Sequence, residues 1–400
     1  MARTYRSAIK GIFRYVFIPA ATLVLLAYIA CYAFRLPWPQ NLLPLALETA
    51  PPSKSYRYFD TVAWPASDRP LHFQEAAGSF TDTDPVPWRG GRPVSFADFQ
   101  YETHTNALLI LHRNKLVYEK YYNGNARETS FPSFSLAKAI VSALVGAALQ
   151  DGFIKSIDDP VANYVPALAG ASSYANITIR QLLDMRAGID VEERYDSPFS
   201  RIAYMYASTD LNRFVSGLRS IAVVPGTAYD YKSVDYQLLT MMLKGATGKP
   251  ASAYLNEKLW QPMGAQYDAS WSVDSAQNKV EKGFCCINAR AIDFVKIGAL
   301  YLNQGVLNGK RILPAAWTRR HQNGTGVDDF FLYGNGWWLP MVPSPDKDFA
   351  AIGIYGQFIY VNPATGTVIV KMSDHGAEQD EALTFDIFRT VAQRLAGSRP

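Results

Sequence analysis

Two long apolar stretches stand out from the alternation of apolar and polar positions along the chain. Tyr15 to Phe34 is twenty residues without a charge, a length that matches the hydrocarbon core of a bilayer and predicts a membrane-spanning helix. From Ala137 to Leu149 almost every residue is apolar or small, and Asp151-Gly152 then provides a helix-stop signal. A helix that is apolar on every side is a buried one, so the second stretch predicts the centre of a globular core.

Shorter patterns predict strands toward both ends of the remaining chain, with helices between them. Ala107 to His112 and Leu116 to Tyr122 are β-rich runs that predict a hairpin, and further strands are expected at Gln357 to Asn362 and Thr367 to Met372. Helical patterns occur behind a capping Thr178, over residues 200–260, at Ala289 to Leu302 as an amphipathic helix, and at Glu381 to Leu395. This order predicts an α+β fold in which a terminal antiparallel sheet carries an inserted helical region.

Composition divides the chain into three parts. Residues 1–36 form a basic tip and the predicted transmembrane anchor, and residues 37–100 are rich in Pro, Ser, Asp and aromatic residues, which predicts a linker and an irregular N-terminal extension. Residues 101–400 form the predicted globular domain, with a mainly helical subdomain at about 135–285.

Basic residues in front of the first apolar stretch predict its orientation. They are not balanced by acidic residues before Glu48, so the N-terminus is expected in the cytoplasm and the bulk of the chain on the periplasmic side of the inner membrane, after a single pass. A cleaved signal peptide and a buried soluble helix are the alternatives, although no clear small-x-small cleavage site precedes a polar mature start. Tyr28-Ile29-Ala30-Cys31 lacks the Leu that usually opens a lipidation site, so lipidation is not expected.

Charge and cysteine content exclude several classes of function. The net charge is +4, and the basic residues around the first apolar stretch supply +5, so the remainder carries about −1 and gives no electrostatic basis for binding nucleic acid. Three cysteines are too few for a disulfide framework, and Cys285-Cys286 are interpreted as small core residues. Five scattered histidines show no metal-ligand spacing, so neither a metal nor another cofactor is expected.

Candidate chemistry begins with Ser-x-x-Lys, a pattern that occurs at Ser7–Lys10, Ser135–Lys138 and Ser344–Lys347. Only the middle pair opens a buried helix, where residues three apart share one face. A hydroxyl beside an amine at that position is the arrangement an activated serine needs. The alternative interpretation is a helix-capping serine followed by a solvated lysine.

Six stretches in a fixed order carry a family resemblance. They resemble the serine β-lactamase and penicillin-binding superfamily, specifically its class C-like branch with esterases and 6-aminohexanoate-dimer (nylon oligomer) hydrolases. The likeness covers about residues 100–395. The stretches are Leu116-Val117-Tyr118-Glu119-Lys120-Tyr121-Tyr122, Ser133-Phe134-Ser135-Leu136-Ala137-Lys138, Ile177-Thr178-Ile179-Arg180-Gln181-Leu182-Leu183-Asp184-Met185, Pro225-Gly226-Thr227-Ala228-Tyr229-Asp230-Tyr231-Lys232-Ser233, Ala289-Arg290-Ala291-Ile292-Asp293-Phe294 with Asn303-Gln304-Gly305, and Gly353-Ile354-Tyr355-Gly356-Gln357.

The resemblance implies a β-lactamase-like (DD-peptidase-like) fold and a set of site residues. Ser135 matches the nucleophile that forms an acyl-enzyme, Lys138 the amine that takes up its proton, and Tyr231 the phenol that relays protons to the leaving group. Ser233 stands in the second motif where Asn is common, as a supporting residue of the relay. The implied oxyanion donors are the N–H groups of Ser135 and of Ile352 or Ile354. Tyr195 resembles a loop tyrosine that covers the substrate.

One departure changes the functional expectation. The family's third motif commonly carries a cation that helps to hold a substrate carboxylate, and the corresponding stretch here, Phe349 to Gly353, has none. The sequence therefore predicts a serine hydrolase that cleaves a small linear amide or ester through an acyl-enzyme. A penicillin-binding DD-peptidase or β-lactamase is the alternative within the enzyme class, and a non-catalytic membrane-tethered scaffold is the alternative outside it. Neither the substrate nor the oligomeric state is predicted.

Overall fold

The computed structural model describes residues 13–47, 51–76, 80–168, 172–327, 330–342, 344–376 and 380–397. Its N-terminal part contains η1 (Phe13–Phe17), α2 (Ile18–Ala33), α3 (Pro39–Ala46), η2 (Pro52–Tyr58), β1 (Thr61–Trp64), β2 (Gln74–Glu75), β3 (Pro85–Val86), η3 (Arg89–Gly91), β4 (Val94–Ser95), α4 (Phe96–Glu102), β5 (Thr105–His112) and β6 (Lys115–Tyr121). The predicted basic tip with Ser7–Lys10 lies outside the described residues.

A large, mostly antiparallel sheet forms one side of the globular body. In the described part of the chain its strand order is β12-β13-β14-β15-β16-β17-β5-β6-β2, and the β2–β6 pair is parallel. The predicted hairpin is confirmed as β5 and β6, and the predicted C-terminal strands as β16 and β17. The strands from the C-terminal half are β12 (Gly326–Val327), β13 (Phe331–Gly334), β14 (Trp337–Pro340), β15 (Phe349–Gly353), β16 (Gln357–Asn362) and β17 (Thr367–Ser373).

A smaller sheet supports the segment that carries Ser135. Its order is β1-β8-β9-β7, with β7 at Ser130–Pro132, β8 at Ala269–Ser272 and β9 at Ile287–Arg290. β7 leads directly into the central helix, so pairing between β7 and β9 sets where that helix begins.

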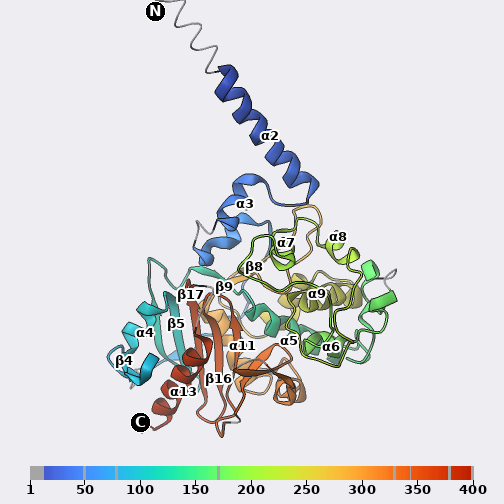
Figure 1. Cartoon of the computed structure of the whole chain (residues 1–400). Coiled ribbons are helices and arrows are strands. Elements are labelled where there is room, and N and C mark those ends of the chain that lie inside the picture. Colours follow the sequence, from blue (N-terminus) through green and yellow to red (C-terminus); the bar gives the residue numbers. More distant parts are fainter. Residues whose placement is uncertain are drawn as a thin grey trace, which may run out of the picture.

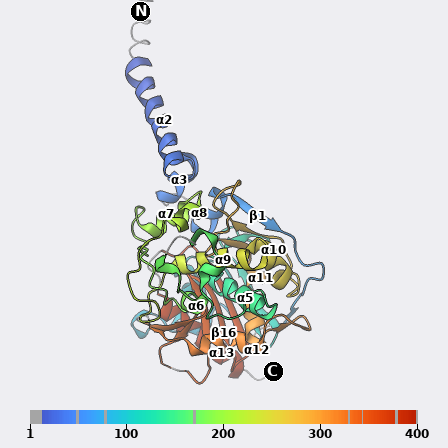
Figure 2. The ribbon, with the colours of Figure 1, turned by 90° about the vertical axis from the view of Figure 1, so that its right-hand side faces the viewer.

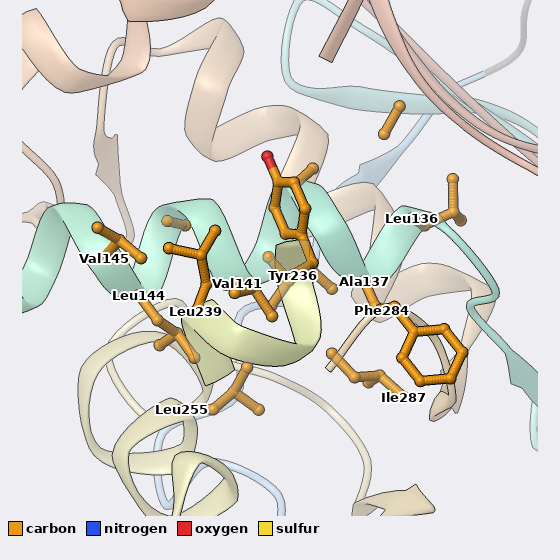
Figure 3. Close-up of a cluster of buried hydrophobic side chains, with 14 of the residues drawn as sticks. Leu136, Ala137, Val141, Leu144, Val145, Tyr236, Leu239, Leu255, Phe284 and Ile287 are labelled. Carbon is orange, nitrogen blue, oxygen red and sulfur yellow. The ribbon is translucent and has the colours of Figure 1, made fainter. Parts of the chain in front are cut away.

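Helix α5 (Leu136–Gln150) confirms the predicted buried helix, because every residue from Leu136 to Ala148 is buried. It packs against α9 (Ser233–Thr247), and Leu144 and Val145 of α5 meet Leu239 of α9 in a continuous apolar cluster (Figure 3). The other helices of this region are α6 (Ile179–Leu183), α7 (Arg201–Ala207), α8 (Leu211–Ser216) and α10 (Ala251–Leu255). The predicted cap Thr178 is confirmed, since its hydroxyl accepts the N–H of Gln181 in a capping box.

Helices α13 and α11 both pack on the large sheet. The C-terminal helix α13 (Glu381–Gly397) lies against it in Figure 1, where it was predicted. Helix α11 (Ala291–Leu302) also forms as predicted, but residues 291–301 are all buried, so its expected amphipathic character is wrong. It packs against β16, β17 and β5 and has no face left for solvent.

The N-terminal apolar stretch forms a helix that points away from the body (Figures 1 and 2). Within the described residues, Tyr15–Ala33 is one helix long and apolar enough to cross a membrane by length and composition, a test that a signal sequence also passes. Helix α3 lies between this helix and the body, and the extension after it contributes β1 to the small sheet and β2 to the large one.

The cysteine interpretation needs one correction. Cys285 and Cys286 are core residues, each 4% exposed, but they are also joined to one another by a disulfide between neighbours in the chain. The count of cysteines could not reveal this pair, because adjacent residues close no loop of the kind that staples a small fold.

Candidate active site

Ser135 lies at the junction between β7 and α5. The Ser133 N–H donates to the carbonyl of Ile287 at 2.7 Å, and the Ser133 hydroxyl accepts the Ile287 N–H at 3.0 Å, which fixes the junction to β9. Phe134 has φ of 41°, a left-handed conformation that is costly for an aromatic residue and turns the chain sharply into the helix. Ser135 occupies the N-cap position, but its side chain makes no capping hydrogen bond. The capping alternative is therefore wrong.

Lys138 is 1% exposed, so the solvated-lysine alternative is wrong as well. Its Nζ donates to Ser135 Oγ at 2.9 Å, to the Phe284 carbonyl at 3.1 Å and to Ser233 Oγ at 3.3 Å. These three acceptors satisfy the three N–H bonds of an ammonium. A carbonyl can only accept, so Phe284 keeps one N–H in either protonation state, and a neutral amine can direct its lone pair at Ser135.

Burial is the main influence on the protonation of this lysine. It lowers the pKa of Lys138 to about 8, while the charges of Glu193 and Asp235 act in the opposite direction. A lysine with a pKa near 8 exists partly as the free amine at neutral pH, as a proton acceptor must. The Ser135–Lys138 pair thus has the distance that a nucleophile and its base require, and burial favours the neutral form of the lysine.

Tyr231 and Ser233 reach the same lysine from the start of α9. The ring of Tyr231 lies 4.9 Å from Lys138 Nζ and stacks on Trp338 of β14 with ring centres 5.5 Å apart. The segment that holds Tyr231 runs along the end of α6, where the Asp230 N–H donates to the Met185 carbonyl. The stretches 177–185 and 225–233, which both carry the family resemblance, are therefore in direct contact here.

Glu193 was not singled out from the sequence, yet it connects two of the predicted residues. One of its carboxylate oxygens accepts the N–H of Ser233 at 3.0 Å, and the other accepts the hydroxyl of Tyr195 at 2.5 Å. Lys232 at the N-cap of α9 makes no side-chain capping bond, so this carboxylate from a separate loop does the capping. Through these two contacts, Glu193 positions Ser233 next to Lys138 and connects it to Tyr195.

Asp235 is a second acidic residue that sequence reasoning missed. It is fully buried one turn into α9, and neither carboxylate oxygen has a hydrogen-bond partner among the described residues. Burial raises its pKa well above the ordinary range, and the charge of Glu193 adds to that effect.

The strand β15 passes directly beside the nucleophile. A Cβ built on Gly353 would lie 3.0 Å from the backbone nitrogen of Ser135, so only glycine fits without displacing the backbone. Of the two predicted oxyanion donors, Ile354 lines the cavity that contains Ser135, whereas Ile352 is a buried residue within β15. The arrangement favours the Ile354 N–H over that of Ile352.

A cavity of about 460 Å³ opens above Ser135. Tyr195 is 47% exposed at its edge, and Phe134 packs edge-to-face on Tyr355 at 5.1 Å within its wall. Among the described residues, no group of three His, Cys, Asp or Glu side chains is placed to hold a metal ion. The lining residues are Leu42, Leu45, Ala46, Phe134, Ser135, Arg194, Tyr195, Asp196, Ser197, Pro198, Ile202, Ala203, Tyr206, Ala207, Ser233, Phe284, Cys285, Ile354 and Tyr355.

Comparison with known proteins identifies the family of the chain. The family model described as Beta-lactamase matches residues 96–389, which is most of the chain. The 6-aminohexanoate-dimer hydrolase of Paenarthrobacter ureafaciens is 29% identical over 295 residues, covering 68% of this chain and 73% of that protein.

Solved structures show the same fold. The "Putative 6-aminohexanoate-dimer hydrolase from Bacillus anthracis" superposes with a TM-score of 0.73 at 22% identity, covering 87% of this chain and 94% of that one. A family VIII carboxylesterase superposes with a TM-score of 0.60 at 19% identity, covering 75% of this chain and 95% of that one.

Proposed function

The chain belongs to the beta-lactamase family, and we propose that this hydrolase cleaves a linear amide or ester through a covalent acyl-enzyme on Ser135. The observation that carries the proposal is the 2.9 Å contact between Ser135 Oγ and the fully buried amine of Lys138. A structural serine–lysine pair gains nothing from burying the lysine, since desolvation of an ammonium is costly.

The proposed reaction has two halves. Ser135 Oγ attacks the carbonyl carbon while its proton passes to the neutral Lys138, and the oxyanion is held by the N–H groups of Ser135 and Ile354. The proton then moves through Tyr231, with Ser233 as a supporting hydroxyl, to the leaving amine or alcohol as the C–N or C–O bond breaks. Water attacks the acyl-enzyme by the reverse relay and releases the acid. Tyr195 covers the substrate.

A linear amide or ester fits better than a cell-wall peptide or a β-lactam. β15 carries no cation that could pair with a substrate carboxylate. The relative named for the 6-aminohexanoate dimer is a hydrolase of a linear amide, and the carboxylesterase of the same fold acts on esters by its name.

The test compares Ser135→Ala with Ser344→Ala, a change in another Ser-x-x-Lys of this chain. Wild-type protein and Ser344→Ala are expected to react with a fluorophosphonate and to hydrolyse p-nitrophenyl acetate, and Ser135→Ala to do neither. Hydrolysis that survives in Ser135→Ala refutes the proposal. Stoichiometric labelling of Ser135 by a fluorescent penicillin at low concentration favours the DD-peptidase alternative, and no adduct or hydrolysis with any substrate favours the scaffold.

We also propose that α2 is a single-pass inner-membrane anchor and that the N-terminus lies in the cytoplasm. The N-terminal extension then reaches to about residue 100. The hydrolase domain that follows, with its helical subdomain at about 135–285, lies in the periplasm. Carbonate extraction of the full-length protein tests the anchor. Release of protein whose N-terminus has been processed near residues 31–40 refutes it.

A further inference from the structure

Helix α3, which follows the apolar N-terminal helix, forms part of the wall of the cavity above Ser135. Leu42 and Leu45 are half-buried and line this cavity together with Ala46. The two leucines are three residues apart and therefore share one face of the helix. Leu43 and Leu47 are 54% and 66% exposed and do not line the cavity. The inward face of α3 thus belongs to the candidate active site, although α3 lies outside the residues matched by the family model.

Several contacts hold α3 in this position. The Tyr204 hydroxyl of α7 donates to the Phe34 carbonyl at 2.9 Å, and the Thr209 N–H donates to the Arg35 carbonyl at 2.8 Å. On the other side of α3, Ser53 of η2 donates from both its N–H and its hydroxyl to Asp374. The chain is therefore attached to the body both before and after α3.

The rest of the cavity near α3 is also largely apolar. Ile202 and Ala203 of α7, together with Pro198, extend the apolar surface from α3, and Phe284 continues it to Ser135. The volume of about 460 Å³ is within the range of sites that enclose a ligand of moderate size. Such a surface favours a hydrocarbon chain, since each methylene that leaves water favours binding about fourfold.

The cavity also indicates which side of the scissile bond the chain occupies. Phe134, Ser135 and Ile354 line it around the nucleophile and the proposed oxyanion site, and Ser233 of the proposed proton relay also reaches it, whereas Tyr231 does not line it. Tyr231 protonates the leaving group in the proposed mechanism. We therefore place the acyl side of the substrate in the cavity and its leaving group toward Tyr231.

The position of α3 next to the apolar helix connects the cavity to the bilayer. Leu42 is eight residues beyond Phe34, which limits their separation to about 27 Å even if the chain were fully extended. In both views α3 lies at the base of α2 and next to α7 (Figures 1 and 2). A substrate held in the outer surface of the membrane would reach this side of the protein first.

We propose that the substrate is a membrane-embedded amphiphile, an ester or amide whose long acyl chain binds between α3 and α7 with its carbonyl at Ser135. The proposal rests on the serine hydrolase function and the membrane anchor proposed above, and it adds a substrate class and a specificity determinant. Leu42 and Leu45 bind the acyl chain, and the chain enters from the bilayer in which α2 is anchored.

The experiment uses full-length protein in lipid vesicles and compares two matched double variants. Leu42→Ala with Leu45→Ala removes the inward leucines, and Leu43→Ala with Leu47→Ala removes two outward leucines of the same segment. The substrates are p-nitrophenyl acetate and p-nitrophenyl decanoate. Partitioning of decanoate into vesicles affects both variants equally, so the difference between the variants reports the cavity.

We expect kcat/KM for decanoate to fall about tenfold to twentyfold in the inward variant, the effect of losing contact with about two methylenes. The outward variant should retain it within about twofold, and the ratio of kcat/KM for decanoate to kcat/KM for acetate should fall only in the inward variant. Equal effects of the two variants on decanoate refute the proposal. Sensitivity of decyl acetate, but not of the decanoyl ester, to the inward change refutes the acyl-side assignment.

A second arm distinguishes the bilayer from solution as the source of substrate. p-Nitrophenyl hexadecanoate is incorporated either into the vesicles that carry the protein or into separate vesicles. Hydrolysis at least about tenfold faster in the shared vesicles is expected, and equal rates refute delivery from the bilayer. If acetate is hydrolysed in a Ser135-dependent way but these differences are absent, only this inference fails. If no ester is hydrolysed by wild-type protein, the proposed function fails and this inference with it.

Discussion

The protonation of Lys138 makes a quantitative prediction about the pH dependence of hydrolysis. Burial lowers its pKa to about 8, and only the neutral amine can accept the proton of Ser135. The neutral fraction is about one in eleven at pH 7 and about ten in eleven at pH 9. We therefore expect kcat/KM to rise about tenfold between these pH values and then to level off.

Glu193→Gln tests whether this rise belongs to Lys138. The Glu193 carboxylate raises the pKa of Lys138, so removing its charge lowers the midpoint of the profile. The glutamine keeps the size of the side chain, and its amide oxygen can still accept the Ser233 N–H while its NH₂ group faces the Tyr195 hydroxyl. For a fall of one pKa unit, the ratio of rates at pH 9 and pH 7 shrinks from about ten to about two.

The assay follows p-nitrophenyl acetate hydrolysis from pH 6 to pH 10, with the rate of Ser135→Ala subtracted at each pH to remove hydrolysis by hydroxide. Lys249→Met is the matched control, because Lys249 is a surface lysine paired with Glu257 and its loss should leave the midpoint unchanged. A wild-type midpoint near 6.5, the range of histidine, that does not move in Glu193→Gln would falsify the assignment of Lys138 as the base.

Three further changes test the supports of the site. Gly353→Ala places a methyl group 3.0 Å from the backbone nitrogen of Ser135. We expect kcat to fall about a hundredfold with little change in the melting temperature. Normal activity of this variant would contradict the close approach of β15 to Ser135. Cys285→Ala with Cys286→Ala removes the disulfide that follows Phe284, whose carbonyl accepts a hydrogen bond from Lys138. We expect kcat to fall by a larger factor than KM rises. Thiol titration of the unfolded wild-type protein checks that the disulfide forms. Gly146→Ala would bring a methyl group within 2.5 Å of the Trp317 ring and should lower the free energy of unfolding by about 1–3 kcal/mol in urea denaturation.

The parts of the fold that the sequence predicted are those with a strong local signal. Helix α5 is apolar over its whole length, and the strands β16 and β17 are separated by a turn that contains Pro363 and Gly366, so both could be placed within one or two residues. The amphipathic assignment of α11 was wrong because this helix is covered by β16, β17 and β5 of the large sheet and by β9 of the small one. The sequence of a single helix does not show how many of its faces will be covered by other elements.

Ser135 and Lys138 could be proposed from the sequence because they are three residues apart on one helix. The residues that were missed act from other segments. Glu193, which accepts the Ser233 N–H, lies in a loop sequence of acidic and basic residues that is typical of a solvated surface. Phe284 contacts Lys138 through its backbone carbonyl, a group that every residue type has, so its side chain gives no signal. Gly353 is within a predicted motif, but its role depends on the approach of β15 to α5, which is a tertiary contact.

The missing cation of β15 changes how this site must lower the pKa of its lysine. A second positive charge near Lys138 would lower that pKa directly, but β15 carries none, and the nearby carboxyl groups of Glu193 and Asp235 act in the opposite direction. Exclusion of water is then the effect that keeps the amine reactive. Lys138 is 1% exposed without any substrate, and the ring of Tyr231, itself stacked on Trp338, lies 4.9 Å from its Nζ. In this proposal the apolar wall of the cavity selects the substrate, whereas the packing around Lys138 sets the protonation state on which hydrolysis depends.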